Sequence, residues 1–222
     1  MAFLTESRIE SVVLAGTGGF SLEVFDYLQL QAEQGGPKVA GFIDPRAEAS
    51  SPAGIDLPFL GSIDAFALQP HQVVVVAIGS VAWREAAHRA LWARGIPTPA
   101  FVAHQAVVSP GAHVAPGALI CPFSIINREA RLGEGVLVNV HCSVGHGAEV
   151  GEHSILSPYA ALNGNAAVGA RSFLGTRATI YPGIRIGEAC VVDSHTGVRV
   201  SAADRHLISS RGQYTSNPLR LR

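Results

Sequence analysis

The sequence predicts a small α/β domain with a parallel sheet, followed by an all-β parallel β-helix. Two observations lead to this prediction. A bulky aliphatic residue occupies every sixth position from Val108 to Val198 without a single insertion. Before these repeats, residues 12–101 alternate short aliphatic runs with amphipathic segments, which is typical of parallel strands joined by crossover helices.

A strict period of six fits neither an α-helix, whose period is about 3.6, nor an ordinary strand, whose period is about 2. It fits a β-helix in which each six-residue repeat forms one short strand, three repeats form a triangular coil, and the aliphatic side chains fill the interior. Four positions after most of these residues, a small side chain recurs. The aliphatic positions are Val108, Val114, Ile120, Ile126, Leu132, Val138, Val144, Val150, Leu156, Leu162, Val168, Leu174, Ile180, Ile186, Val192 and Val198.

Composition agrees with this architecture and narrows the class of partner. The 222 residues include 24 Gly and 13 Pro, as a chain with a turn at every corner requires, and only 15% are charged. The formal net charge of −1 argues against nucleic acid as a partner. Residues 1–10 contain no apolar run and no segment reaches transmembrane length, so we expect a cytoplasmic protein without a membrane partner.

The three cysteines do not form a disulfide framework. Cys142 and Cys190 occupy the small position of their repeats, which points into the β-helix. We therefore expect buried free thiols, as in a reducing compartment.

The first hundred residues read as strands and helices in alternation. Glycines 16, 18 and 19 follow the first strand, and a helix then runs to the glycines at 35 and 36. A second helix runs from about Ala82 to Arg94, with Trp83 and Trp92 as packing groups and His88 on its surface. The expected strands are 12–15, 39–43, 73–78 and a short last one near 99–101.

Parallel sheets bind ligands at the carboxyl ends of their strands. In this chain those ends carry small and polar residues, and a glycine turn that opens a helix can receive a phosphate on its backbone amides. We therefore expect a nucleotide or nucleotide-sugar site; the alternative is that the glycines only make a tight turn, because the motif is Gly-x-Gly-Gly and not the full dinucleotide fingerprint. The candidate substrate-binding residues are Gly16, Gly18, Gly19, Asp44, Gly79 and Ser80.

The order of these parts resembles the PglD/NeuD-like sugar acyltransferases. The likeness covers nearly the whole chain, and its most specific segments are 12–19, 41–44, 75–84, 104–116 and 139–160. The resemblance implies a Rossmann-like domain over residues 1–103, a left-handed β-helix over 104–202 and a C-terminal tail over 203–222. It also implies a homotrimer that moves an acetyl or similar acyl group from acetyl-CoA to an amino or hydroxyl group of a nucleotide-linked sugar, without a metal.

The resemblance also assigns residues. His146 matches the family's general base, which can take the proton that the attacking amine or hydroxyl must lose, and Asn139 matches its neighbour in the motif. The CoA-binding candidates are Gly164, Gly175 and three residues of a tail motif, Asn217, Pro218 and Arg220. For the trimer, we expect outward side chains such as Phe123 and Tyr159 to be buried between chains.

Four positions depart from the family pattern. Gly147 follows His146 where the family has Asp or Glu, so Glu149 and Glu152 are the remaining carboxylates for orienting the imidazole. The other departures are Phe20 and Ile155, each in place of a histidine, and Asp193, which stands where glycine commonly lets CoA lie close.

Two other functions remain open from the sequence. A zinc enzyme like the γ-class carbonic anhydrases is one, because His141 and His146 have the His-x4-His spacing. Catalytic zinc needs three protein ligands, and no third histidine stands one coil earlier. The other is a β-helical scaffold that binds a ligand without turnover, which the four departures favour.

Overall fold

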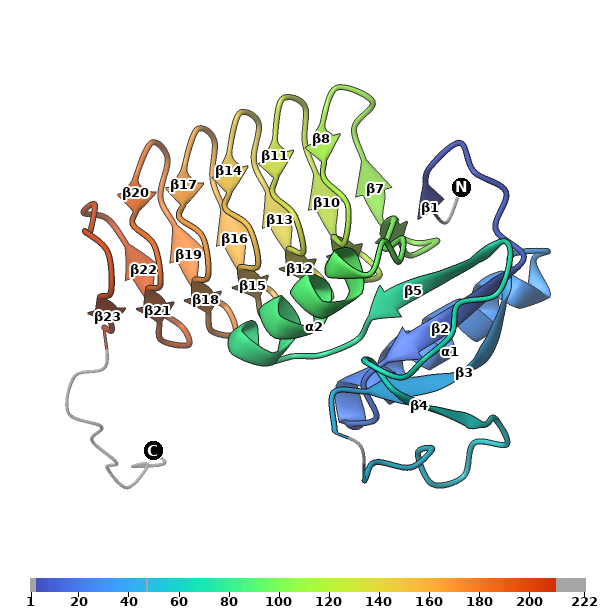
Figure 1. Ribbon diagram of the computed structural model, residues 1–222. Coiled ribbons are helices and arrows are strands. Elements are labelled where there is room, and N and C mark those ends of the chain that lie inside the picture. The colour runs from blue at the N-terminus through green and yellow to red at the C-terminus, as the bar shows by residue number, and fades with distance from the viewer. Residues whose placement is uncertain (1–2, 47, 211–222) are drawn as a thin grey trace, which may run out of the picture.

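The computed structural model describes residues 3–46 and 48–210. Its first part is a four-stranded parallel sheet in the order β4-β3-β2-β5, with α1 and α2 as crossover helices (Figure 1). The expected strands and helices are confirmed within a few residues, and β4, with its short Phe-Leu-Gly-Ser sequence, was not foreseen. The elements are β2 (Ser11–Ala15), α1 (Gly19–Glu33), β3 (Lys38–Asp44), β4 (Phe59–Ser62), β5 (Gln72–Val76) and α2 (Val81–Ala93).

The two faces of this sheet belong to two apolar clusters, because side chains alternate along each strand. Val12 and Leu14 of β2 pack with Leu28 of α1 in one cluster. Val13 of the same strand packs with Leu91 of α2 in the other. The helices therefore cover opposite faces, which leaves the carboxyl ends of β2, β3 and β5 to form a common edge.

The second part is a β-helix of two-residue strands that repeat every six residues. Most strands pair in parallel with the strand one coil, or eighteen residues, further on: Ile126 pairs with Val144, and Val144 with Leu162. The last pair differs, because Val191 of β21 pairs with Leu207 of β23, sixteen residues on. The strands are Val107–Val108 (β7), His113–Val114 (β8), Leu119–Ile120 (β9), Ile125–Ile126 (β10), Arg131–Leu132 (β11), Leu137–Val138 (β12), Ser143–Val144 (β13), Glu149–Val150 (β14), Ile155–Leu156 (β15), Ala161–Leu162 (β16), Ala167–Val168 (β17), Phe173–Leu174 (β18), Thr179–Ile180 (β19), Arg185–Ile186 (β20), Val191–Val192 (β21), Gly197–Val198 (β22) and Leu207–Ile208 (β23).

The strands form three faces of a triangular left-handed tube (Figure 1). Face 1 contains β9, β12, β15, β18, β21 and β23; face 2 contains β7, β10, β13, β16, β19 and β22; face 3 contains β8, β11, β14, β17 and β20. We name the turns between them the 1–2, 2–3 and 3–1 corners. The predicted aliphatic residues form one cluster inside the tube, as expected.

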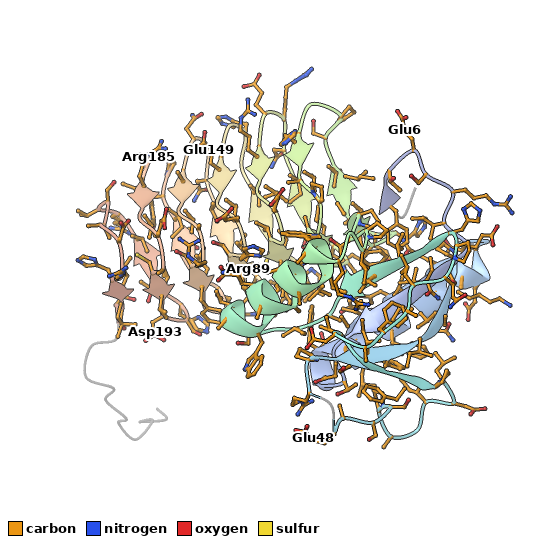
Figure 2. All side chains as sticks on the ribbon, viewed as in Figure 1. Glu6, Glu48, Arg89, Glu149, Arg185 and Asp193 are labelled. Carbon is orange, nitrogen blue, oxygen red and sulfur yellow. The ribbon has the colours of Figure 1, made fainter. Side chains whose placement is uncertain are left out.

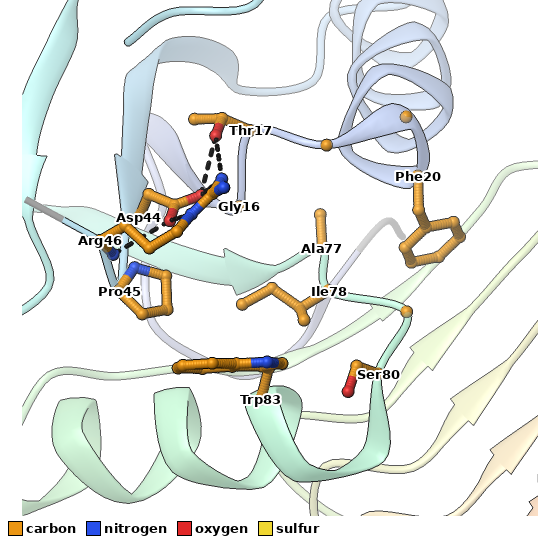
Figure 3. Close-up of a pocket in the computed structure, with 13 residues that line it drawn as sticks. Gly16, Thr17, Phe20, Asp44, Pro45, Arg46, Ala77, Ile78, Ser80 and Trp83 are labelled. Carbon is orange, nitrogen blue, oxygen red and sulfur yellow. Dashed lines mark hydrogen bonds and ion pairs between the residues drawn. The ribbon is translucent and has the colours of Figure 1, made fainter. Parts of the chain in front are cut away.

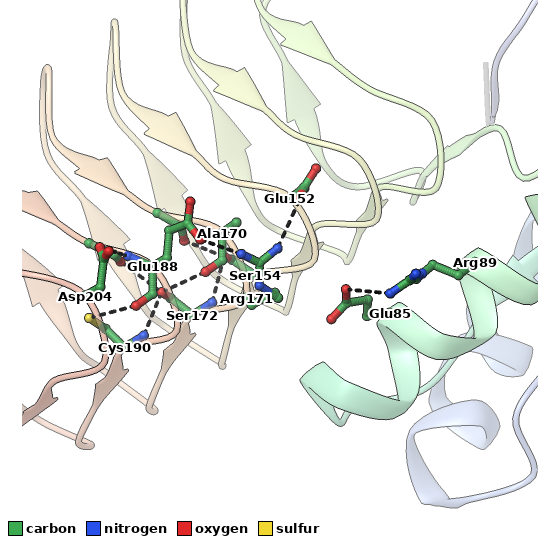
Figure 4. Close-up of polar contacts among 12 residues, drawn as sticks. Glu85, Arg89, Glu152, Ser154, Ala170, Arg171, Ser172, Glu188, Cys190 and Asp204 are labelled. Atoms are coloured by element: carbon green, nitrogen blue, oxygen red, sulfur yellow. Dashed lines mark hydrogen bonds and ion pairs between the residues drawn. The ribbon is translucent and has the colours of Figure 1, made fainter.

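The small interior positions are also used for hydrogen bonds. Ser154 donates from its hydroxyl to the carbonyl of Gly169 (2.9 Å) and accepts from the amide of Ser172 (3.0 Å). The hydroxyl of Ser172 in turn accepts from the amide of Cys190 (3.0 Å), one coil further on (Figure 4). The expected burial of Cys142 and Cys190 as free thiols is confirmed, and Cys121 is likewise free and buried.

The first strand of the tube differs from the expectation. The segment near Pro99–Phe101 was assigned to the sheet domain, but β6 (Ala100–Val102) pairs with β9 of face 1, and on its other side with β1 (Phe3–Leu4). The reason is periodicity: Val102 stands six residues before Val108 and joins the same interior cluster. The repeats therefore begin one six-residue repeat earlier than the sequence predicts.

The sheet domain packs on face 1 of the tube. Leu119, Leu137 and Ile155 are outward side chains of face 1, and each is at most 2% exposed because it shares a cluster with Val12 and Leu28. This accounts for Ile155, which stands where the family has a histidine: its side chain belongs to the contact between the two parts.

Arg84 on α2 joins the two parts by hydrogen bonds. It is completely buried, and it donates to the carbonyls of Gly135 (2.7 Å) and Gly117 (2.9 Å) at the 3–1 corner, and to that of Val76 at the end of β5. Burial lowers the pKa of Arg84 to about 9, so the guanidinium still carries its charge at neutral pH. Among the residues that the structure describes, no carboxylate pairs with Arg84, and three carbonyl oxygens hold its charge.

Two histidines and a tryptophan fill the space beside Arg84. The rings of His88 and Trp92 lie 4.9 Å apart and those of His88 and His153 5.6 Å apart, measured between centroids. The expectation of His88 on the helix surface was wrong, because α2 packs against the sheet on one side and the tube on the other. Within the described ranges, His88 Nε2 and His153 Nδ1 are buried without a hydrogen-bond partner.

These histidines make the contact between the sheet domain and the tube sensitive to acid. Burial lowers the pKa of both His88 and His153, and Arg84 lowers them further, while Glu85, Glu134 and Glu152 partly oppose this at His153. A lowered pKa means that the unfolded chain takes up protons at a higher pH than the folded chain does. Stability is therefore complete above about pH 6.5 and falls below it, by at most about 1.4 kcal/mol per pH unit for each histidine.

We therefore expect the melting temperature to fall between pH 7 and 5.5, above the range in which most carboxylates titrate. His88→Gln should flatten this dependence. His113→Gln, a change at an exposed histidine on face 3, should leave it as it is. Identical pH profiles for wild type and His88→Gln would contradict the assignment.

Candidate active site

A cavity of about 380 Å³ lies at the carboxyl ends of β2, β3 and β5 (Figure 3). All six residues predicted to bind substrate line it: Gly16, Gly18, Gly19, Asp44, Gly79 and Ser80. The sequence reading did not select Thr17, Arg46 and Trp83, which line it as well. The sequence could have indicated them, because each stands within three positions of a residue that was selected.

Gly16 sets the end of β2 against the end of β5. Its φ is +123°, and a Cβ there would meet the carbonyl oxygen of Ala77 at 2.8 Å, so no other residue fits without a shift. Its carbonyl accepts a hydrogen bond from the buried hydroxyl of Ser21 (2.7 Å). This glycine therefore serves the turn, while Gly18 and Gly19 have open space around them.

Two helix N-termini converge on the cavity. The N-cap residues are Gly18 for α1 and Ser80 for α2, and neither makes a side-chain cap hydrogen bond. Neither first turn contains an acidic residue. The first amides of each helix and the positive ends of both helix dipoles therefore favour an anion between them.

Asp44 ends β3 at the opposite wall of the cavity. It is 3% exposed, and it accepts hydrogen bonds from the Thr17 hydroxyl (2.8 Å) and from Nε of Arg46 (2.8 Å). Burial by itself would raise the pKa of Asp44, but the hydrogen bonds from Arg46 and Thr17 outweigh it and hold the pKa below its usual value. Asp44 is therefore an ionised carboxylate paired with Arg46.

Trp83 forms another wall. The expectation that it is a packing group was wrong, because 58% of its surface is exposed at the cavity. Trp92, nine residues later, faces the tube and packs as expected. Nine residues are two and a half helical turns, so the spacing places the two indoles on opposite sides of α2. What the sequence did not show is that the Trp83 side faces a cavity.

His146 stands at the 2–3 corner, between β13 and β14, with its side chain exposed as expected. Its ring lies over Gly164 of the next coil: a Cβ on Gly164 would meet Nε2 of His146 at 2.5 Å. Glycine at 164 thus makes room for the imidazole. The sheet domain, which contains the cavity, lies on face 1 of the tube, whereas His146 lies at the corner between faces 2 and 3. Within one chain, the cavity and His146 are therefore on different sides of the tube.

The other predicted residues of the tube lie elsewhere. Asn139 and Gly175 are at the 1–2 corner, with Asp193 one coil beyond Gly175. Asn139 Oδ1 accepts from the amide of Val140 (2.7 Å). Asn217, Pro218 and Arg220 lie outside the described residues. Within a single chain, therefore, Gly164 lies beside His146, whereas Asn139 and Gly175 lie at another corner.

Neither candidate carboxylate orients His146. Glu149 pairs with Arg185 (3.5 Å) on face 3, where both project away from the sheet domain (Figure 2). Glu152 pairs with Arg171 (3.1 Å) at the 3–1 corner, and Arg171 also contacts Glu188 (Figure 4). Neither Glu149 nor Glu152 therefore takes the place of the Asp or Glu that follows the histidine in the family.

The His141 and His146 pair does not form a metal site within the chain. His141 stands at the 1–2 corner, stacked between Phe123 (5.0 Å) and Tyr159 (4.7 Å), while His146 occupies the next corner. In residues 3–46 and 48–210, no group of three or more His, Cys, Asp or Glu side chains is placed to hold a metal ion. The arrangement therefore lacks the three ligands that catalytic zinc requires.

Comparison with known protein families assigns the domain that carries the cavity. The family model of the PglD N-terminal domain matches residues 11–91. The first domain is a PglD N-terminal domain. The predicted likeness to PglD/NeuD-like proteins is thereby confirmed, together with the Rossmann-like sheet. The β-helix is confirmed by the strand pairing of the structure.

Solved structures extend the likeness to the whole chain. A histidine-to-asparagine mutant of perosamine N-acetyltransferase from Caulobacter crescentus, in complex with CoA and GDP-perosamine, is 25% identical, with a TM-score of 0.82 over 95% of this chain and 99% of that one. WeeI from Acinetobacter baumannii AYE is 23% identical, with a TM-score of 0.79 over 90% and 96%. The acetyltransferase domain of PglB from Neisseria gonorrhoeae FA1090 is 22% identical, with a TM-score of 0.76 over 87% and 93%.

The chain thus has the architecture of acetyl-CoA-dependent sugar acetyltransferases. No curated protein sequence matches it. No helix in the described ranges is long and apolar enough to cross a membrane.

Proposed function

We propose that this protein is an acyl-CoA-dependent acyltransferase that moves an acetyl or similar acyl group to an amino or hydroxyl group of a nucleotide-linked sugar. The observation that carries the proposal is the cavity of the PglD N-terminal domain, where two uncapped helix N-termini meet at the ends of parallel strands. This cavity suits a diphosphate. The similar perosamine N-acetyltransferase was solved with CoA and GDP-perosamine, which are a donor and an acceptor of these two chemical classes.

In the proposed reaction, the sugar amine or hydroxyl attacks the thioester carbonyl of the acyl donor. A bond forms from nitrogen or oxygen to the acyl carbon, the carbon–sulfur bond breaks, and CoA leaves as the thiolate. His146 takes the proton from the attacking group and can return it to the thiolate. Its exposed imidazole over Gly164 is free to approach a substrate at the 2–3 corner.

We propose a supporting role for the other residues that match the family. Asn139 would position the acceptor, and Gly164 and Gly175 would border the groove for the donor. Asn217, Pro218 and Arg220 would close over CoA. Because Asn139 and Gly175 stand at a different corner from His146, these roles require two neighbouring β-helices.

A trimer would supply the neighbours, with each active site between adjacent tubes. Phe123 and Tyr159 are 56% and 46% exposed in the single chain, and burying them between chains would remove apolar surface from water. Three chains of 23.2 kDa give an expected mass of about 70 kDa by light scattering. A monomer at all concentrations would rule out both the trimer and the shared site.

Binding of nucleotide sugars tests the role of the cavity. We expect UDP-, GDP- or dTDP-linked sugars to bind the purified protein in calorimetry. Gly79→Leu should abolish binding, because the nearest side-chain atom to a Cβ at 79 is Phe20 Cβ at 3.9 Å and the added side chain would occupy the cavity. The variant should keep the melting temperature and the CoA binding of the wild type.

An assay of acetyl transfer from acetyl-CoA to amino- and hydroxy-sugars, each linked to a nucleotide, tests the activity itself. Transfer with any of them supports the proposal. If CoA binds, nucleotide sugars bind and no acceptor is acylated, the protein is a binding scaffold.

A further inference from the structure

Trp83 is an unpartnered aromatic side chain at a ligand cavity. Its indole is 58% exposed and makes no hydrogen bond or ring contact with any described residue. In Figure 3 the flat ring extends from the first turn of α2 along one side of the cavity, with Pro45 and Ile78 across from it. A large apolar ring held in this way offers its face to a planar ligand.

Arg46 faces the same cavity from the end of β3, and its guanidinium is held in place. Nε donates to Asp44 Oδ1 (2.8 Å), and Nη2 donates to Asp44 Oδ2 (3.2 Å) and to the Thr17 hydroxyl (3.2 Å). Within residues 3–46 and 48–210, the second terminal nitrogen of this fork, Nη1, has no hydrogen-bond partner. The arginine is therefore oriented in advance, with two donors left for a ligand.

Asp44, in contrast, has no acceptor capacity left. Oδ1 accepts from the amide (3.0 Å) and from Nε of Arg46, and Oδ2 accepts from Thr17 and from Nη2 of Arg46. These four bonds fill the roughly four acceptor sites of a carboxylate. Asp44 was predicted to bind substrate; in the structure its side chain contacts Thr17 and Arg46, and these contacts orient Arg46.

We propose that the nucleobase of the substrate lies in a slot lined by the face of the Trp83 ring and by the Arg46 guanidinium, and that Asp44 and Thr17 are positioning residues for this slot. The inference rests on the proposed function, because it assumes a nucleotide in the cavity. With the base in the slot, the diphosphate reaches the amides at the starts of α1 and α2. The slot recognises a flat aromatic ring and not one particular base, since every base has a π-face.

Calorimetry with ligands that do and do not contain a base tests the slot. The ligands are UDP, GDP and dTDP, with inorganic pyrophosphate as the ligand that lacks a base. We expect Trp83→Ala to weaken binding of the three nucleotides by about 5- to 150-fold and to leave pyrophosphate binding unchanged. Trp83→Phe should retain most of the nucleotide affinity.

Arg46→Ala should also weaken nucleotide binding. Its matched control is Arg89→Ala on α2, where the arginine is exposed, pairs only loosely with Glu85 (3.9 Å) and lies outside the cavity lining (Figure 2). Thr17→Val should reduce nucleotide affinity and Thr17→Ser should restore it, because serine keeps the hydroxyl that holds Arg46 and Asp44 together. A purely structural role would show instead as a loss of melting temperature in Thr17→Val.

Tryptophan fluorescence provides an independent readout, because the chain has only two tryptophans. Nucleotides should quench the emission of wild type, pyrophosphate should not, and Trp83→Phe, which keeps Trp92, should show no quenching by either. If nucleotides bind wild type and Trp83→Ala equally well, the slot is overturned and the proposed function stands. If no nucleotide binds wild type, the nucleotide part of the proposed function falls, and the slot with it.

Discussion

Replacing His146 with alanine is expected to lower the rate of acyl transfer by about 10²- to 10⁴-fold, which is the usual effect of losing a general base. The side chain is exposed at the 2–3 corner and lies over a glycine, so its removal should leave the tube intact. The measurement is the steady-state rate with the correct acceptor, together with the melting temperature. The rate should fall while the melting temperature stays the same.

His141→Ala is the matched control, since it removes a second exposed imidazole one corner away. It takes a ring out of the stack with Phe123 and Tyr159 and should reduce the rate only mildly. A zinc enzyme would require both changes to be equally damaging and EDTA to inhibit. If His146→Ala retains full activity, His146 has no role in the mechanism, and His195 and His153 become the next residues to replace.

Arg84→Ala is expected to cost about 3 kcal/mol or more of unfolding free energy. The change removes a completely buried guanidinium and leaves the carbonyls of Val76, Gly117 and Gly135 without this donor. Losing charged hydrogen bonds and opening a cavity are both among the changes that destabilise proteins most. Urea unfolding followed by circular dichroism measures the loss.

Arg89→Ala serves as the control here too, because an exposed arginine on the same helix should change stability by less than about 0.5 kcal/mol. Arg84→Lys should recover little, since one ammonium cannot reach three carbonyls in the geometry of a planar fork. Equal stability of wild type and Arg84→Ala would mean that burying an unpaired cation costs as much as its three hydrogen bonds contribute.

The sequence was sufficient for the features that depend on local periodicity. The six-residue repeat predicted the tube and its interior, and the strand ends with their glycines predicted the cavity at Gly16, Asp44 and Gly79. It also predicted the outward position of His146. In each case, the information lies within a few residues of the position concerned.

The features that the sequence did not predict depend on contacts between distant segments. His88 reads as a surface residue until α2 is packed against the tube, and Trp83 reads as a packing residue until β3 and α2 are seen to enclose a cavity. The role of Arg46 likewise depends on Thr17, which is 29 residues away. Periodicity does not encode such pairings, since they arise from the way in which the strands are ordered in the sheet.

The shared packing on face 1 limits how this chain can be recombined with its relatives. Its outward side chains Leu119, Leu137 and Ile155 are covered only because the sheet domain lies on them. A chimera cut at residue 103 would place these side chains against a foreign domain, or expose them to water as an apolar patch prone to aggregation. Exchange of nucleotide specificity between such enzymes therefore requires transplanting the cavity residues alone, or else moving face 1 together with the domain that covers it.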